Sequence, residues 1–236
     1  SYSAWRRPLS SAAPSDAALL AMFSVTPAAI LDGTETSDTL TWNFNSGAEA
    51  FDYLADGETL ILEYTVKATD NADVPLADLE TVTITLTGAN DAPIIAIVDV
   101  AGAITEGATL TDSGSITFTD VDVSDRPLAI EATSSVTALA QGGGPLALSA
   151  PQQAAIEAAF AISADAGNTN NGAINWAYTI TEAALDFLGQ GEVVTAVFTI
   201  TVTDDEGATA TQDVTLTITG ANDAPIIAIV DVAGAI

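Results

Sequence analysis

The sequence predicts an all-β protein made of tandem antiparallel β-sandwich domains with one short helix per repeat. Residues 87–104 (TGANDAPIIAIVDVAGAI) recur unchanged as residues 219–236. An exact repeat at this distance indicates similar domains strung end to end. Threonine alternates with valine, isoleucine and leucine over long stretches, which is typical of half-buried strands. Hydrophobic residues make up 48% of the chain, enough to build cores rather than a disordered acidic tail.

The repeat sets the expected domain boundaries. We expect an incomplete first repeat over 1–88, a linker over 89–93, a complete second repeat over 94–220, and a linker with the opening strand of a next repeat over 221–236. The first repeat is incomplete because it has no counterpart of residues 94–125. Two interpretations follow: a fragment of a longer array, or a subunit whose residues 225–236 fill the gap in another copy by strand addition.

The first half of the second repeat contains three expected strands and a helix. Residues 94–100 form the opening strand, and residues 115–119 form a second strand that runs into Asp120. Residues 128–133 form a third strand. A helix is expected over 152–161, because Ser149 can cap its start and Gln152 stands three residues later, the spacing of a capping box.

The second half supplies the remaining strands. Trp176 and Tyr178 lie two residues apart and therefore share one face of a strand, as do Trp42 and Phe44 in the first repeat. We expect these aromatic side chains in the core; a platform on which sugar rings stack is the alternative. The alternating segments Val193–Thr203 and 212–219 are expected to form two long strands. About seven strands in some 130 residues fit an antiparallel sandwich.

Composition excludes several classes of function. The chain carries 4 basic and 32 acidic residues, a net charge of −28, so a nucleic acid is not an expected partner. It has no cysteine and no histidine, which excludes disulfides, ordinary zinc sites and Ser-His or Cys-His catalysis. No apolar run approaches 18 residues, so we expect no membrane insertion. Acids are spread everywhere and no pair stands out as catalytic, so we do not expect an enzyme.

The spacing of acidic residues predicts a calcium site near the linker. Calcium takes six to eight hard oxygen ligands from carboxylates, amides and main-chain carbonyls. Loops at one pole of a sandwich can bring together residues far apart in sequence. The candidate ligands are Asn90, Asp91, Asp120, Asp122 and Asp204, with Asp125 and Asp205 as alternates. Each of these residues, considered alone, is also of a type that is common in turns.

Several motifs, in order, resemble a known family. G-x-I-x-F-T-D-V-D-x-S-D is followed by L-x-x-G-E, T-V-T-D-D-x-G and T-x-T-I-T-G-A-N-D-A-P. This series is similar to the VCBS-type repeats, which are bacterial cadherin-like domains with a cadherin/Ig-like Greek-key fold in large secreted, RTX-type adhesins. The resemblance covers nearly all of the second repeat and the last two thirds of the first. It implies an extracellular or cell-surface location and export by type I secretion.

The resemblance to cadherins also implies a second half-site. In the cadherin linker pattern D-x-N-D-N-x-P, the chain matches at Asn90, Asp91 and Pro93, whereas Gly88 and Ala92 replace two ligands, which implies one or two ions rather than three. The early D-x-D pair and the late A-x-D-x-x-G motif match at Asp120, Asp122, Asp204 and Gly207. Cadherin domains carry an early glutamate that reaches the following linker, and the matching residues here are Glu106, Asn222 and Asp223.

These observations predict a calcium-stiffened stalk repeat of a bacterial adhesin, active in cell adhesion and biofilm formation. The expected partners are neighbouring repeats or other copies of the chain, while other domains would bind host or surface glycans and proteins. One alternative is a fibre subunit joined head to tail by donation of residues 225–236. Another is a carbohydrate-binding module that uses Trp42 or Trp176.

Overall fold

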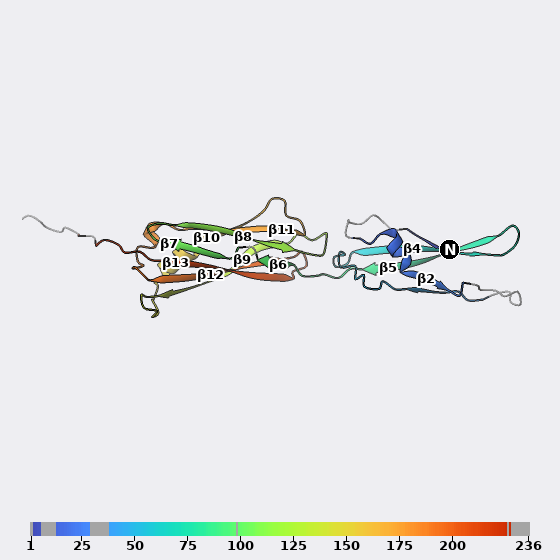
Figure 1. Cartoon of the computed structure of the whole chain (residues 1–236), viewed down its shortest axis with the longest axis horizontal. Helices are drawn as coiled ribbons and strands as arrows, with labels where there is room; N and C mark the ends of the chain where they lie inside the picture. The colour runs from blue at the N-terminus through green and yellow to red at the C-terminus, as the bar shows by residue number, and fades with distance from the viewer. Residues whose placement is uncertain (1, 6–12, 29–37, 98, 226, 228–236) are drawn as a thin grey trace, which may run out of the picture. The chain divides into compact units, whose positions relative to one another are not determined.

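The computed structural model describes residues 2–5, 13–28, 38–97, 99–225 and 227. Contacts divide the chain into two compact units. The first unit comprises Ser1–Asp91 and Asp120–Asp125, and the second comprises Ala92–Thr119 and Arg126–Ile236. Both units consist mostly of strands (Figure 1), which confirms the predicted all-β class. One boundary falls inside the expected linker, at Asp91, whereas the loop Asp120–Asp125, expected within the second repeat, groups with the first unit.

The second unit is a sandwich of two four-stranded sheets (Figure 1). Its strands are β6 (Ile94–Ile97), β7 (Ala101–Thr105), β8 (Thr111–Thr119), β9 (Leu128–Leu139), β10 (Phe160–Ala164), β11 (Asn171–Thr179), β12 (Val193–Thr203) and β13 (Thr209–Thr219). One sheet has the order β10-β11-β8-β6 and the other the order β7-β13-β12-β9. Neighbouring strands pair antiparallel, except that β7 runs parallel to β13.

The core of the second unit follows from the alternation in its strands. Along β12 every second residue is fully buried, and the residues between them are half-buried. The Phe198 ring stacks on the Phe160 ring of the other sheet, with centroids 4.1 Å apart. Burying one such side chain contributes roughly 2–3 kcal/mol. The bounds of β12 are those expected from the sequence, because alternation over 11 residues leaves one register that buries the apolar set.

Trp176 lies deep in this core. It is 1% exposed, and its indole Nε1–H donates to the main-chain oxygen of Asp99 at 2.7 Å. Gly114 pairs with it on β8, and a Cβ at Gly114 would stand 2.7 Å from the indole ring. The expected core position of Trp176 is therefore confirmed, and its ring is not available to stack on a sugar. The same expectation is wrong for Trp42, which is 48% exposed.

Two local expectations need correction. The opening strand expected over residues 94–100 is shorter: β6 ends at Ile97, and β7, which belongs to the other sheet, begins at Ala101. Asp99 lies between them rather than inside a strand. Its main-chain oxygen accepts the bond from Trp176, and its Oδ1 accepts a hydrogen bond from Ala101 N at 3.4 Å, which lets the chain turn from one sheet to the other.

The helix is shorter than expected and starts earlier. It is α2 (Ala150–Glu157), and the Ser149 N–H donates to Gln152 Oε1 at 2.7 Å, as the capping box predicts. It ends before 161 because Phe160 pairs with Tyr178 at the start of β10. The short 3₁₀ helix η1 (Glu182–Ala184) follows β11. None of the helices in the described part of the chain has the length and hydropathy to cross a membrane.

The first unit repeats part of this plan. Its elements are β1 (Tyr2–Trp5), α1 (Asp16–Ala21), β2 (Phe23–Thr26), β3 (Thr41–Phe44), β4 (Thr59–Thr69) and β5 (Ala77–Thr87). They form sheets of order β1-β4-β5 and β2-β3. The Tyr64 ring stacks on Phe23 with centroids 4.3 Å apart, and its hydroxyl donates to Leu19 O. By sequence, β3, β4 and β5 correspond to β11, β12 and β13.

The glycine at the second position of the repeated segment packs against main chain in both units. A Cβ at Gly220 would stand 2.5 Å from Gly189 O and 2.7 Å from Leu188 Cβ, and one at Gly88 would collide with the main-chain oxygens of Leu54 and Ala55. Backbone atoms cannot move aside cheaply. This close approach explains why glycine occupies this position in both copies.

We expect Gly220→Ala to lower the free energy of unfolding of the second unit by about 1–3 kcal/mol, the usual cost of overpacking. Urea denaturation followed by circular dichroism measures the loss. Gly167→Ala is the matched control, because a Cβ there meets no atom within 4 Å; its effect should stay within about 0.5 kcal/mol. Equal effects of the two substitutions would show that the close approach at Gly220 does not constrain the fold.

Candidate metal centre

The loop after β8 carries three aspartates whose main chain is fixed by local hydrogen bonds. The Asp122 N–H donates to Asp120 Oδ1 at 3.0 Å, and the Asp125 N–H donates to the main-chain oxygen of Asp122 at 3.2 Å. Short acidic side chains favour such turns because they accept bonds from the backbone two residues on. The first of these bonds holds Asp120 and Asp122 side by side at the end of the strand.

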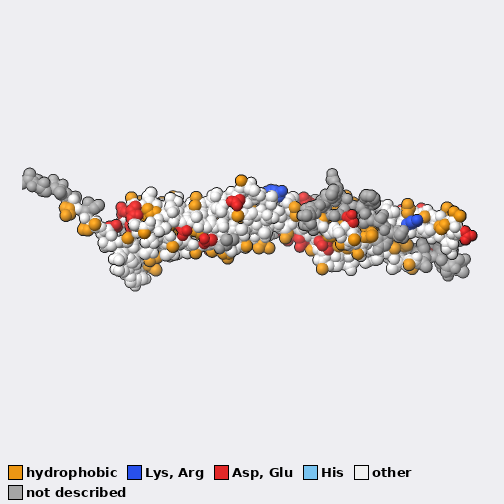
Figure 2. Space-filling view, turned by 45° about the horizontal axis from the view of Figure 1, so that its top comes forward, with side chains coloured by type: hydrophobic (Ala, Val, Ile, Leu, Met, Phe, Trp, Pro, Cys, Tyr) orange, Lys and Arg blue, Asp and Glu red, His pale blue; other side chains and the backbone are white. Residues whose placement is uncertain are grey.

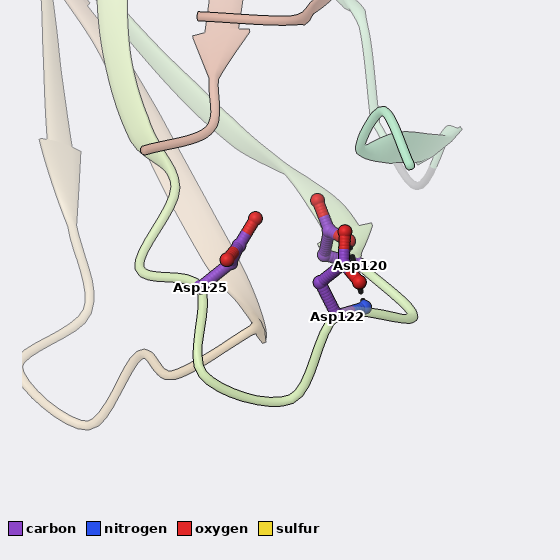
Figure 3. Close-up of side chains that lie close together, drawn as sticks. All are labelled: Asp120, Asp122 and Asp125. Carbon is purple, nitrogen blue, oxygen red and sulfur yellow. Dashed lines mark hydrogen bonds between the residues drawn. The ribbon is translucent and has the colours of Figure 1, made fainter. Parts of the chain in front are cut away.

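Three carboxylates meet in this loop. Asp120, Asp122 and Asp125 are 5%, 0% and 2% exposed, and one carboxylate oxygen from each lies within 4.8 Å of the others. Figure 3 shows all three carboxylates on the same side of the loop, with the bond from Asp122 N to Asp120 dashed. Two unit charges at this separation repel by roughly 3–4 kcal/mol at an effective dielectric constant of about 20. Buried charges of one sign call for a counter-charge.

The linker residue Asp91 contacts the same cluster through its backbone. The Asp91 N–H donates to Asp122 Oδ2 at 2.8 Å, while the Asp91 side chain is exposed and Asn90 is half-buried. Val123 N donates to Tyr53 O at 3.4 Å, and the Val123 side chain packs on the core of the first unit. The loop and the linker are thus held together within the first unit.

Asp204 belongs to the second unit, in the turn after β12. It is 6% exposed, and its Oδ1 accepts hydrogen bonds from Glu206 N at 3.0 Å and Ala208 N at 2.7 Å. Gly207 completes the turn with a φ of 93°. Both bonds are typical of an acidic residue that stabilises a turn. The neighbouring alternate, Asp205, is exposed. The role of Asp204 as a calcium ligand stays a prediction.

Glu106 forms a second acidic centre, within the second unit. Its side chain is 2% exposed, its Oε2 accepts a hydrogen bond from Ala221 N at 2.7 Å, and its buried Oε1 has no hydrogen-bond partner. Glu106 therefore reaches the segment of Asn222 and Asp223, whose side chains are both exposed.

The pKa of Glu106 lies above its ordinary value of 4.5. Burial is the largest cause, and the negative charges of Asp223, Glu182 and Asp186 add to it, whereas the bond from Ala221 opposes it. The folded protein holds the carboxyl proton of Glu106 more tightly than the unfolded chain does. The protonated Glu106 therefore contributes its full stabilisation of the fold below about pH 4.5, and this contribution is lost as the pH rises through the pKa of the folded state. A cation beside Glu106 would replace the proton.

We therefore expect Glu106→Gln, in the presence of a chelator, to stabilise the protein near neutral pH and to flatten the fall in stability above pH 4.5. The free energy of unfolding in urea, measured from pH 4 to pH 8, provides the test. Glu157→Gln, on α2, is the control and should leave the pH dependence in place. If the stability of Glu106→Gln varies with pH in parallel with that of the wild type, the raised pKa of Glu106 is not the cause of the pH dependence.

Three residues of these centres were not among the primary candidates from the sequence. Asp125 was expected only as an alternate, because nothing in its spacing from Asp120 shows that the loop folds back. Glu182 and Asp186 were not expected at all, since they lie more than 70 positions from Glu106. Only the packing of η1 beside the start of the repeat brings their charges near it.

Comparison with known proteins adds little to the geometry. No family model matches the sequence, and no curated protein matches it. Among solved structures, the chain is similar to one described as the crystal structure of the Protocadherin GammaB4 extracellular domain, with 12% sequence identity and a TM-score of 0.38. The match covers 93% of this chain and 27% of that one.

Proposed function

We propose that this chain is a calcium-binding structural repeat from the stalk of a bacterial surface or secreted adhesin. The observation that carries the proposal is the buried cluster of Asp120, Asp122 and Asp125, whose oxygens lie within 4.8 Å of one another. The adhesin assignment, and with it the extracellular location and the role in cell adhesion, is supported by the motif series that resembles VCBS-type repeats. The proposal gives the chain no catalytic role.

The residues present fit calcium better than other common metals. The donors are hard carboxylate oxygens, and the chain has no histidine or cysteine to favour zinc or copper. Calcium accepts six to eight oxygens in flexible geometry, whereas magnesium demands a near-ideal octahedron. Three aspartates, some bidentate, with Asn90, Asp91 and main-chain oxygens of the linker, meet the calcium requirement.

Calcium would act on the segments that connect the units. The chain passes from one unit to the other after Asp91, after Thr119 and after Asp125. A cation held by the aspartate cluster and by the linker would restrain all three passages at once. Without the cation, repulsion among the carboxylates favours a looser loop and linker. The ion would therefore stiffen the junction, which is the property that a stalk needs.

Weak binding would suit this role. Extracellular modules bind calcium with dissociation constants on the order of 10⁻⁴–10⁻³ M. A site of that strength would stay empty in the cytosol and fill after export. Calcium would then stiffen the chain only where a stalk is useful.

Small-angle X-ray scattering tests the proposal. In about 5 mM calcium we expect a narrow distribution of intramolecular distances, and in chelator a broader one, because the junction samples more orientations. Magnesium at the same concentration is the control for ionic strength and should resemble the chelator sample. Identical profiles in calcium and in chelator would overturn the stiffening role.

A further inference from the structure

The first unit exposes residues whose counterparts in the second unit are buried. Trp42 is 48% exposed, whereas its counterpart Trp176 is 1% exposed. Along β5, Val82, Ile84 and Leu86 are half-buried, and their β13 counterparts are 0% exposed, namely Val214, Leu216 and Ile218. In the second unit β7 runs along the edge of β13, but among the described residues no strand pairs with the corresponding edge of β5.

A groove occupies this open side of the first unit. It has a volume of about 270 Å³ and lies between β3, β4 and β5, with Trp42, Val66 and Val82 in its lining. Asp78 and Glu80 also line it. The groove is thus an apolar surface beside an edge of β5 with which no described strand pairs, the combination that accepts an added strand.

The sequence itself identifies an occupant. Residues 225–236 are identical to residues 93–104, which contain the whole of β6 and most of β7. In the second unit these residues cover Trp176: a Cβ at Gly102 would stand 3.1 Å from its ring, and Asp99 O accepts its indole N–H. Ile95, Val100 and Ile104 contribute to that core. Residues 225–236 carry the same apolar set as Ile227, Val232 and Ile236.

We propose that the groove of the first unit binds residues 225–236 of a second copy of this chain as a strand parallel to β5. In the second unit, Leu216 pairs with Gly102 and Ile218 with Ile104. The same register places Gly234 opposite Ile84 and Ile236 opposite Leu86. As Gly102 and Asp99 do at Trp176, Gly234 would then lie over the exposed ring of Trp42, and the main-chain oxygen of Asp231 would accept the Trp42 indole N–H. This inference does not depend on calcium binding.

Charge sets the conditions under which the copies associate. Each chain carries a net charge of −28, and Asp231 would approach Asp78 and Glu80 at the groove. Screening of such repulsion becomes effective when the Debye length falls to about 8–10 Å, near 0.1–0.15 M salt. Association should therefore strengthen as salt is raised, opposite to the behaviour of a contact between opposite charges.

Sedimentation velocity of the full chain, from micromolar to millimolar in 0.5 M salt, tests the proposal. The weight-average sedimentation coefficient should rise with concentration through an open-ended series. Deletion of residues 225–236, or Gly234→Val, should keep the chain monomeric. Ala235→Val is the matched control: its counterpart Ala103 is exposed, so the added bulk points outward and association should persist. Trp42 emission should shift to the blue as association proceeds, and Trp42→Phe should remove that shift.

Four results would overturn the proposal. The wild-type chain could stay monomeric up to millimolar concentration, or association could survive deletion of residues 225–236. Equal association of Gly234→Val and Ala235→Val would exclude the proposed register. A blue shift of Trp42 emission in a monomeric chain that disappears when residues 225–236 are deleted would show instead that the groove binds these residues of its own chain.

Discussion

Asp122→Asn should abolish measurable calcium binding and, at the same time, stabilise the calcium-free protein. Asp122 is fully buried within the aspartate cluster, and its Oδ2 accepts the hydrogen bond from Asp91 N. Loss of a few kcal/mol of attraction between the cation and the carboxylate corresponds to a 10- to 100-fold weaker affinity or more. A site with a millimolar dissociation constant would then bind too weakly to be measured. In chelator, the same substitution removes repulsion between neighbouring carboxylates. The amide oxygen can still accept the hydrogen bond from Asp91 N.

Isothermal titration calorimetry with calcium, and urea denaturation in calcium and in chelator, measure the two effects. The control is Asp73→Asn, which makes the same charge change at an exposed position of the first unit. It should leave the calcium affinity unchanged. If Asp122→Asn binds calcium as tightly as the wild type, the aspartate cluster is not the metal site.

Trp176→Ala should lower the free energy of unfolding of the second unit by about 3–5 kcal/mol, the usual cost of removing a large core side chain. The indole is 1% exposed, its N–H is hydrogen-bonded to Asp99, and its ring lies over Gly114. The substitution leaves a cavity and an unpaired carbonyl. Circular dichroism during urea denaturation measures the loss without relying on tryptophan emission.

The matched substitution is Trp42→Ala, at the corresponding position of the first unit. Half of that side chain is already exposed in the monomer, so the loss of stability in dilute solution should be roughly 1–2 kcal/mol. The difference between the stability losses of the two variants measures how much the burial of Trp176 under β7 and β8 contributes to stability. Equal losses would contradict the exposure of Trp42 and, with it, the open groove.

The long strands and the core were predictable because they depend on local alternation. Val193–Thr203 shows the clearest period of two, and the structure reproduces its bounds. The break between β6 and β7 was not predictable, because residues 94–100 (IIAIVDV) are apolar apart from Asp99 and fit a single strand. Only the bond from Trp176, 77 positions away, shows where the chain changes sheets.

The aspartate cluster was predictable in part. The D-x-D spacing placed Asp120 and Asp122 together, since residues two apart in a strand end share a face. The folding back of the loop, which brings in Asp125, depends on the anchoring of Val123 to the first unit. Likewise, the sequence treated Trp42 and Trp176 alike, because a tryptophan two residues before an aromatic has the same pattern whether or not a neighbouring strand covers it.

A crystal structure of the chain grown in about 5 mM calcium tests the central claim most directly. The account predicts one cation peak between Asp120, Asp122 and Asp125, with oxygen ligands at about 2.3–2.6 Å and at least one ligand from Asn90 or Asp91. Carboxylates that meet only water or one another under these conditions would contradict it.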